Sequence, residues 1–186
     1  MADILFLRGT PAFSAFRLQG LQQKVSAAVP GASLLAADYW HFVSVKAPLG
    51  ERERAQLAAL LEERQTAANE AGELFLVTPR VGTISPWSSK ATDIAWNSGL
   101  SAVERIERGI AFRVAAKSGT LDATARASLA ALLHDRMIET VLTDFAQTAE
   151  LFRHFAPKPL GSVDVVAGGR AALVEANGRL GLALDR

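Results

Sequence analysis

The sequence contains no cysteine, and this absence excludes several kinds of site at once. Without thiols the chain forms no disulfide framework, offers no thiolate nucleophile and cannot build a zinc site that requires sulfur. A cytoplasmic location is therefore expected. Histidine is also scarce: His41, His134 and His154 are the only ones, and no pair has the spacing of metal ligands. We expect structural rather than catalytic roles for all three.

The chain also lacks a charge imbalance and a long apolar run. It has 20 Lys and Arg residues against 19 Asp and Glu residues, a formal net charge of +1. Nucleic-acid binding would require a basic stripe, which this balance does not favour. Polar residues interrupt the longest apolar stretches, such as residues 123–133, and these fall short of the ~20 residues of a membrane span. We expect neither a nucleic-acid nor a membrane partner.

Common catalytic motifs are missing too. No Gly-x-x-x-x-Gly-Lys-Ser/Thr phosphate loop occurs, and no serine lies in a Gly-x-Ser-x-Gly motif. Charged residues of opposite sign alternate over 51–54 and 104–108, a pattern typical of solvated faces. These observations predict no catalytic residue, cofactor-binding residue or metal ligand in this chain.

Hydrophobic patterning predicts a duplicated α+β fold. Short apolar runs are typical of buried strands, and apolar residues at helical spacing indicate amphipathic helices. Short connections between such elements favour two ferredoxin-like repeats related by a pseudo-twofold axis. The first repeat is expected to contain a strand at 4–7, a helix ending before 30, two strands or one long bent hairpin over 33–46, and a helix at 51–64. The second is expected to contain a strand at 73–79, a helix at 86–97, an alternating stretch at 103–115, a helix at 122–133 and a strand near 139–143.

The character of the sequence changes after residue 144. We predict a duplicated domain over 1–148 and the start of a helical linker domain over 149–186. Within the second domain we expect a short helix at 149–155, a linker at 161–169 and a helix from 170 to about 184. The leucines of that last helix need a surface to cover, so we expect the chain to be a piece of a longer polypeptide.

One segment, residues 78–95, is unusually dense in hydroxyls, prolines and charged side chains. Ser85 suits the N-cap of a helix, and Pro86 suits its first helical position. The remaining polar residues suit an anion or a partner's carboxylates at a helix start, so capping and binding stand as equal interpretations. The candidate interface or anion-contacting residues are Arg80, Thr83, Ser85, Trp87, Ser88, Ser89, Lys90, Thr92 and Asp93.

This segment and three others carry a resemblance to a known family. Residues 78–95, 97–109, 132–141 and 177–184 resemble the N-terminal region of large-type phosphoribosylformylglycinamidine synthase, also called formylglycinamide ribonucleotide amidotransferase. The resemblance spans essentially the whole chain. In that family the N-terminal domain is similar to a dimer of a small accessory subunit, which agrees with the duplicated pattern.

The resemblance also implies a function within a larger ligase of purine biosynthesis. In the family, later synthetase domains bind ATP and magnesium, and a glutaminase with a Cys-His-Glu triad releases ammonia from glutamine. These domains lie outside the 186 residues, so this chain would be an inactive module that docks on them and supports ammonia transfer. A stand-alone ferredoxin-like interaction scaffold and a small-anion-binding module using residues 80–93 are the alternatives. Self-association stays open.

Overall fold

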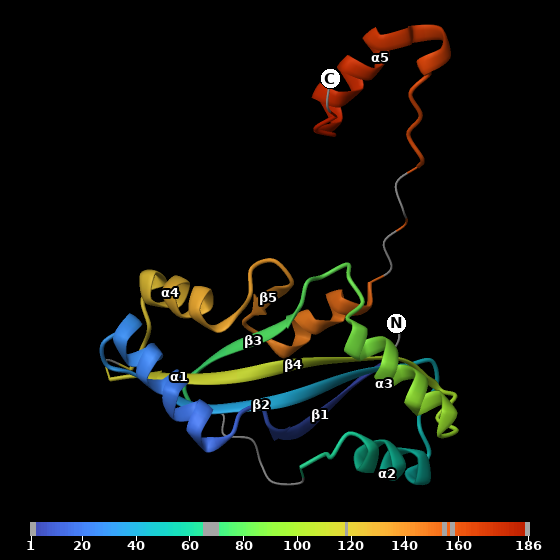
Figure 1. Ribbon diagram of the computed structural model, residues 1–186. Coiled ribbons are helices and arrows are strands. Elements are labelled where there is room, and N and C mark those ends of the chain that lie inside the picture. The colour runs from blue at the N-terminus through green and yellow to red at the C-terminus, as the bar shows by residue number, and fades with distance from the viewer. Residues whose placement is uncertain (1–2, 65–70, 118, 154–155, 157–158, 185–186) are drawn as a thin grey trace. The chain divides into compact units, whose positions relative to one another are not determined.

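The computed structural model describes residues 3–64, 71–117, 119–153, 156 and 159–184 (Figure 1). The chain divides into two compact units, residues 1–154 and 155–186. The domain boundary expected after residue 148 stays a prediction.

The first unit alternates strands with helices and forms one sheet. Its five strands have the order β1-β2-β4-β3-β5, and each neighbouring pair is antiparallel. This mixed α+β architecture confirms the fold class expected from the sequence. The elements are β1 (Asp3–Pro11), α1 (Ala15–Ala28), β2 (Ala32–Val45), α2 (Glu51–Leu60), β3 (Glu73–Pro79), α3 (Pro86–Asn97), β4 (Val103–Ala116), α4 (Ala123–Leu133), β5 (Glu139–Leu142) and a 3-10 helix, η1 (Phe145–Phe152).

The order strand, helix, strand, helix occurs twice with nearly constant spacing. β1-α1-β2-α2 is followed by β3-α3-β4-α4, and the corresponding elements begin at positions 3 and 73, 15 and 86, 32 and 103, and 51 and 123. The two longest strands, β2 and β4, pair with each other at the centre of the sheet. That the two halves superpose about a pseudo-twofold axis stays a prediction.

The expectation of two strands or a hairpin over residues 33–46 is wrong. β2 is a single strand of 14 residues, and it pairs with the equally long β4 from Ala32 opposite Ala116 to Val45 opposite Val103. The pairing register shifts near both ends of β2. Such bulges bend and twist a strand without ending it, which explains why the sequence pattern over these residues is irregular.

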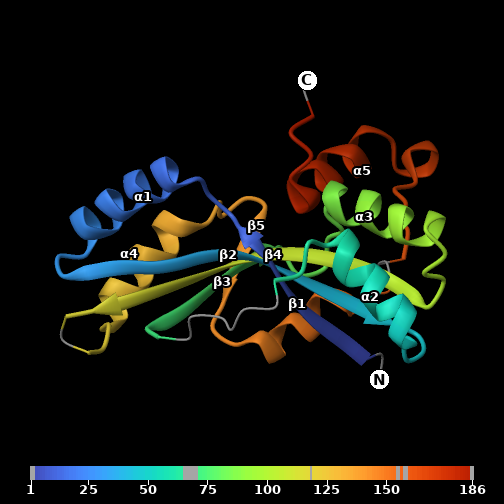
Figure 2. The same ribbon diagram turned by 90° about the horizontal axis from the view of Figure 1, so that it is seen from below.

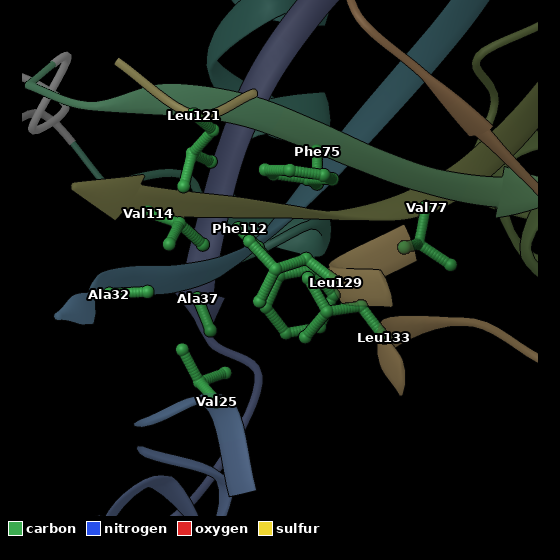
Figure 3. Packing of buried hydrophobic residues seen from close by; sticks show 10 residues of the cluster. All are labelled: Val25, Ala32, Ala37, Phe75, Val77, Phe112, Val114, Leu121, Leu129 and Leu133. Carbon is green, nitrogen blue, oxygen red and sulfur yellow. The ribbon is translucent and has the colours of Figure 1, made fainter. Parts of the chain in front are cut away.

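The helices α1 to α4 cover one face of the sheet. Figures 1 and 2 show α1 and α4 over one end of the sheet and α2 and α3 over the other end. Figure 3 shows the first core, in which α1 and α4 contribute Val25, Leu129 and Leu133 to a cluster with Phe112 of β4. A second core joins α2 and α3 to β1, β2 and β4, with Leu57 fully buried.

The opposite face carries η1. Successive side chains of a strand point to opposite faces, and Val43 of β2 packs with α2 and α3 whereas Phe42 packs with Leu151 of η1. The Phe145 ring lies 4.6 Å from the Trp40 ring, centroid to centroid. The helix expected at 149–155 therefore begins four residues earlier, at Phe145, and is of the 3-10 type.

The second unit contains α5 (Val165–Leu180). Its start corrects the expectation of a linker up to 169, because the Asp164 side chain accepts a hydrogen bond from the Ala167 N–H and caps the helix. Gly169 interrupts the helix with a φ of 54°, and Gly181 ends it in the left-handed conformation. In the described parts of both units, no helix is long and apolar enough to cross a membrane.

Candidate functional site

The loop between β3 and α3 ends in the predicted helix cap. Ser85 is the N-cap of α3, where its Oγ accepts a hydrogen bond from the Ser88 N–H at 3.0 Å, and Pro86 occupies the first turn. The capping interpretation of these two residues is confirmed. Capping leaves the Ser85 hydroxyl hydrogen free to donate in another direction.

The acceptor of this second hydrogen bond is the carboxylate of a buried acid. The Ser85 hydroxyl donates to Oε2 of Glu107 at 3.2 Å, and Oε1 of Glu107 lies 3.2 Å from the Arg105 guanidinium. Glu107 is fully buried. Burial raises the pKa of Glu107 above its ordinary value, although Arg105 and the hydroxyls of Ser85 and Ser88 lower that pKa. The expectation that residues 104–108 form a solvated face is therefore wrong at Glu107.

Thr92 also has a structural position. It is 5% exposed, and its Oγ1 accepts a hydrogen bond from the Ile106 N–H at 3.0 Å. β3 pairs with β4 only from Ile110 to Val114. The Ile106 amide lies beyond that pairing, so Thr92 provides the acceptor that a neighbouring strand would otherwise supply.

Next to this cap, Arg108 of β4 lies against two aromatic rings. Its guanidinium carbon is 4.3 Å from the Tyr39 ring centroid and 4.4 Å from that of Trp87, distances typical of cation–π contacts. Trp87 also stacks on His41, with ring centroids 5.5 Å apart and planes at 20°. Burial first, and Arg108 second, lower the pKa of His41 to about 4. At neutral pH the Arg108 charge therefore has an uncharged imidazole as neighbour.

Arg108, Tyr39 and Trp87 border a cavity of about 700 Å³. Tyr39 and Ile110, which lie opposite each other in the β2–β4 pair, contribute to its lining. The segment from Val77 to Trp87 contributes further lining residues from β3, the loop and α3. Residues 137–139, at and just before β5, complete it. Large apolar side chains beside the cavity are exposed: Ile84 at 60%, Met137 at 76% and Ile138 at 65%.

The cavity gathers only part of the residue set predicted from the sequence. Ser88 and Thr92 are buried and serve the cap and the sheet, so no incoming molecule reaches them. Ser89, Lys90 and Asp93 are exposed on α3 and do not line the cavity; Lys90 borders a smaller cavity of about 230 Å³ between α2 and α3. The predicted residues that do line the larger cavity are Arg80, Thr83, Ser85 and Trp87.

Several residues that line the cavity could not be identified from the sequence alone. Tyr39 and Arg108 come from the two central strands, and the pairing of β2 with β4 places them near Trp87. The exposed pair Met137 and Ile138 was a usable signal, because two large apolar residues follow a polar turn there.

The charged lining of the cavity is suited to binding an anion. Its charged lining residues are Arg80, Arg108 and Glu139, and guanidinium groups bind and orient carboxylates and phosphates. Across the described ranges of the chain, no group of three or more His, Asp or Glu side chains is arranged to hold a metal ion.

Comparison with protein families agrees with the resemblance in the sequence. A family model described as formylglycinamide ribonucleotide amidotransferase N-terminal matches residues 38–152. The match covers more than half of the chain, extends from β2 through η1 and includes every residue that lines the 700 Å³ cavity. The chain therefore belongs to the formylglycinamide ribonucleotide amidotransferase N-terminal family, whose enzyme is an amidotransferase of purine biosynthesis.

Proposed function

We propose that this chain is the non-catalytic N-terminal module of a formylglycinamide ribonucleotide amidotransferase. In this proposal the chain docks on the synthetase and glutaminase domains of the enzyme and supports the transfer of ammonia between them. Family membership supports a place beside other domains of the same enzyme. The docking surface and its contribution to ammonia transfer are our inference from the site.

One observation carries the choice of surface: exposed apolar side chains surround a cavity that holds a half-buried charge. Ile84, Met137 and Ile138 expose more than half of their surface beside the cavity that Arg108 lines. Apolar patches of this kind mark interaction sites, and arginine and aromatic residues are frequent among the residues that dominate binding energy. The arrangement fits a protein surface that another domain covers.

Docking would matter for a chemical reason. Ammonia is protonated near neutral pH, and the ammonium ion has no lone pair with which to attack. An enzyme that produces ammonia at one site and consumes it at another therefore gains from holding the two sites in a fixed relation. A docked, rigid module provides such a constraint without contributing a catalytic group.

The test compares two activities of the complete enzyme. We expect Arg80→Ala and Trp87→Ala to reduce glutamine-dependent turnover more than ammonia-dependent turnover, because only the former requires coupling of the two sites. Arg52→Ala on the exposed side of α2 and Trp96→Ala at the other end of α3 are matched controls. Equal loss of both activities would indicate damage to the synthetase or the fold. Unchanged activities in a folded enzyme would leave this loop with a structural role only.

A second measurement separates the module from a stand-alone scaffold. The purified chain is expected to hydrolyse neither glutamine nor ATP, and mixing it with the remainder of the enzyme is expected to restore glutamine-dependent turnover. ATP turnover by the chain alone, after removal of contaminants, would contradict the non-catalytic role. A mixture that stays inactive would favour the scaffold.

A further inference from the structure

Arg108 differs from the other arginines that lie deep in the first unit. Arg8 is paired with Asp38 at 2.6 Å, and Arg105 is paired with Glu107 at 3.2 Å. Arg108 takes part in none of the hydrogen bonds or ion pairs found among the described residues, although it is partly buried and burial lowers its pKa. Its guanidinium therefore borders the cavity without an acidic partner among the described residues. A bound anion would provide that partner.

Two aromatic rings restrict the position of Arg108 at the cavity wall. The Tyr39 and Trp87 ring centroids lie 4.3 and 4.4 Å from its guanidinium carbon, distances typical of cation–π contacts. A guanidinium group carries its N–H donors in a fixed planar arrangement, and a carboxylate binds it with two parallel hydrogen bonds. The contacts with the two rings therefore limit the freedom of a group that is suited to bind a carboxylate.

The charge and the shape of the cavity define the ligand further. Arg80, Arg108 and Glu139 give its lining a net charge of +1, which a single carboxylate neutralises and a dianionic phosphate exceeds. Apolar lining residues include Ile110 and Ile138. The volume of about 700 Å³ lies within the range of ~300–1,000 Å³ that small-ligand pockets have. The cavity thus suits one carboxylate attached to a compact apolar body.

We propose that the cavity is a carboxylate-binding site in which Arg108 receives the carboxylate. Two sources offer this chemistry: a free small carboxylate, or an Asp or Glu side chain of another domain of the same enzyme. The second source rests on the proposed docking function. The first does not, so binding to the chain alone tests the site independently.

The first experiment titrates the purified chain with phenylacetate and with its neutral analogue phenylacetamide. Isothermal calorimetry and the indole N–H resonance of Trp87 report binding. We expect saturable binding of phenylacetate and at least tenfold weaker binding of phenylacetamide, since only the carboxylate pairs with Arg108. Arg108→Gln should weaken phenylacetate at least tenfold, Arg108→Lys should weaken it less, and Arg52→Gln should leave it unchanged. Amide spectra of each variant establish that it is folded.

The second experiment distinguishes the two sources. The chain is mixed with the remainder of the enzyme, with and without saturating phenylacetate. Inhibition of assembly by phenylacetate, or assembly weakened at least tenfold by Arg108→Gln, assigns the site to an acidic side chain of another domain. Phenylacetate binding without an effect on assembly assigns it to a free carboxylate. Equal affinity for phenylacetate and phenylacetamide would overturn the proposal. So would failure of both to bind, combined with normal assembly of folded Arg108→Gln.

Discussion

His41 allows the environment of the cavity to be tested through protein stability. Its side chain is 6% exposed, stacks on Trp87 and has a pKa lowered to about 4 by burial and then by Arg108. In the unfolded chain the pKa returns to its ordinary value of 6.5. Between pH 6.5 and pH 4 the unfolded chain therefore binds a proton that the folded protein does not bind.

The sign and the size of the effect follow from this difference. Above pH 6.5 the imidazole is neutral in both states and stability is unaffected. As the pH falls from 6.5 to 4, protonation favours the unfolded chain, so the free energy of unfolding decreases by about 1.4 kcal/mol per pH unit. Over the interval from 6.5 to about 4 this amounts to about 3 kcal/mol. Below pH 4 both states carry the proton and the contribution levels off.

The assay is urea denaturation of the wild type and of His41→Phe at several pH values and constant ionic strength. Phenylalanine keeps a ring beside Trp87 but cannot be protonated, so the wild type should lose about 3 kcal/mol more than the variant between pH 6.5 and 4. The comparison with the variant is needed because the titration of Glu107 changes the stability in the opposite direction. Its pKa is raised by burial, so its contribution to stability falls as the pH rises above 4.5, in both proteins alike.

A direct titration provides the decisive result. The midpoint of the His41 ring-proton shift, followed by NMR, should lie near 4. A midpoint near 6.5 would mean that the ring is open to water in solution, and the packing of His41 between Trp87 and the sheet would be refuted. Parallel stability curves for the wild type and for a folded His41→Phe variant would refute the linkage in the same way.

Two further predictions concern the helix cap and the buried acid. Ser85→Ala should lower the free energy of unfolding by ~0.5–2 kcal/mol. The loss should exceed that of Ser14→Ala at the cap of α1, because Ser85 also donates a hydrogen bond to Glu107. Equal losses for the two variants in urea denaturation would contradict this second role of Ser85. Arg105→Met should lower the free energy of unfolding by ~3–5 kcal/mol, because it leaves the buried Glu107 carboxylate without its ion-pair partner. Adding Glu107→Gln should recover part of this loss. An Arg105→Met variant as stable as the wild type would show that the ion pair is unimportant for stability.

Local signals in the sequence determine the elements that were predicted well. The strand at Glu73–Pro79 and the helix at Pro86–Asn97 have the bounds expected from their apolar patterns and from Ser85 as the cap. Such features depend on residues close together in the chain, so a sequence displays them directly. The 3-10 helix at Phe145–Phe152 was misplaced, because its start depends on the aromatic contacts of Phe145 with distant strands.

The candidate site was predicted only in part for the same reason. Arg80 and Trp87 stand in the conspicuous polar segment, whereas Arg108 stands in a run of alternating charges that resembles a solvated surface. Its partly buried position depends on pairing with His41 across β2 and β4. Alternation of charge along a strand does not reveal which face is covered; the register of a neighbouring strand decides this.

The duplicated order of elements explains where the cavity forms. β2 begins at Ala32 and β4 at Val103, and the same offset along the chain leads from Tyr39 to Ile110, its pairing partner. In the predicted twofold arrangement, a residue that pairs with its own counterpart in the other repeat lies at the twofold centre. Both Tyr39 and Ile110 line the cavity, so the cavity borders the β2–β4 pair that joins the two halves of the sheet.

The cavity is nevertheless asymmetric, because the two strand-to-helix loops differ in length. The first loop spans positions 12–14, whereas the second spans positions 80–85 and is twice as long. Both loops end in a serine that caps the following helix, so the additional residues lengthen the path from the strand to that cap. The longer loop supplies part of the cavity wall. By the offset that relates Tyr39 to Ile110, the counterpart of Arg108 is Ala37, which belongs to the hydrophobic core. The charge that we assign to anion binding therefore occurs in one repeat only, on the side where the longer loop borders it.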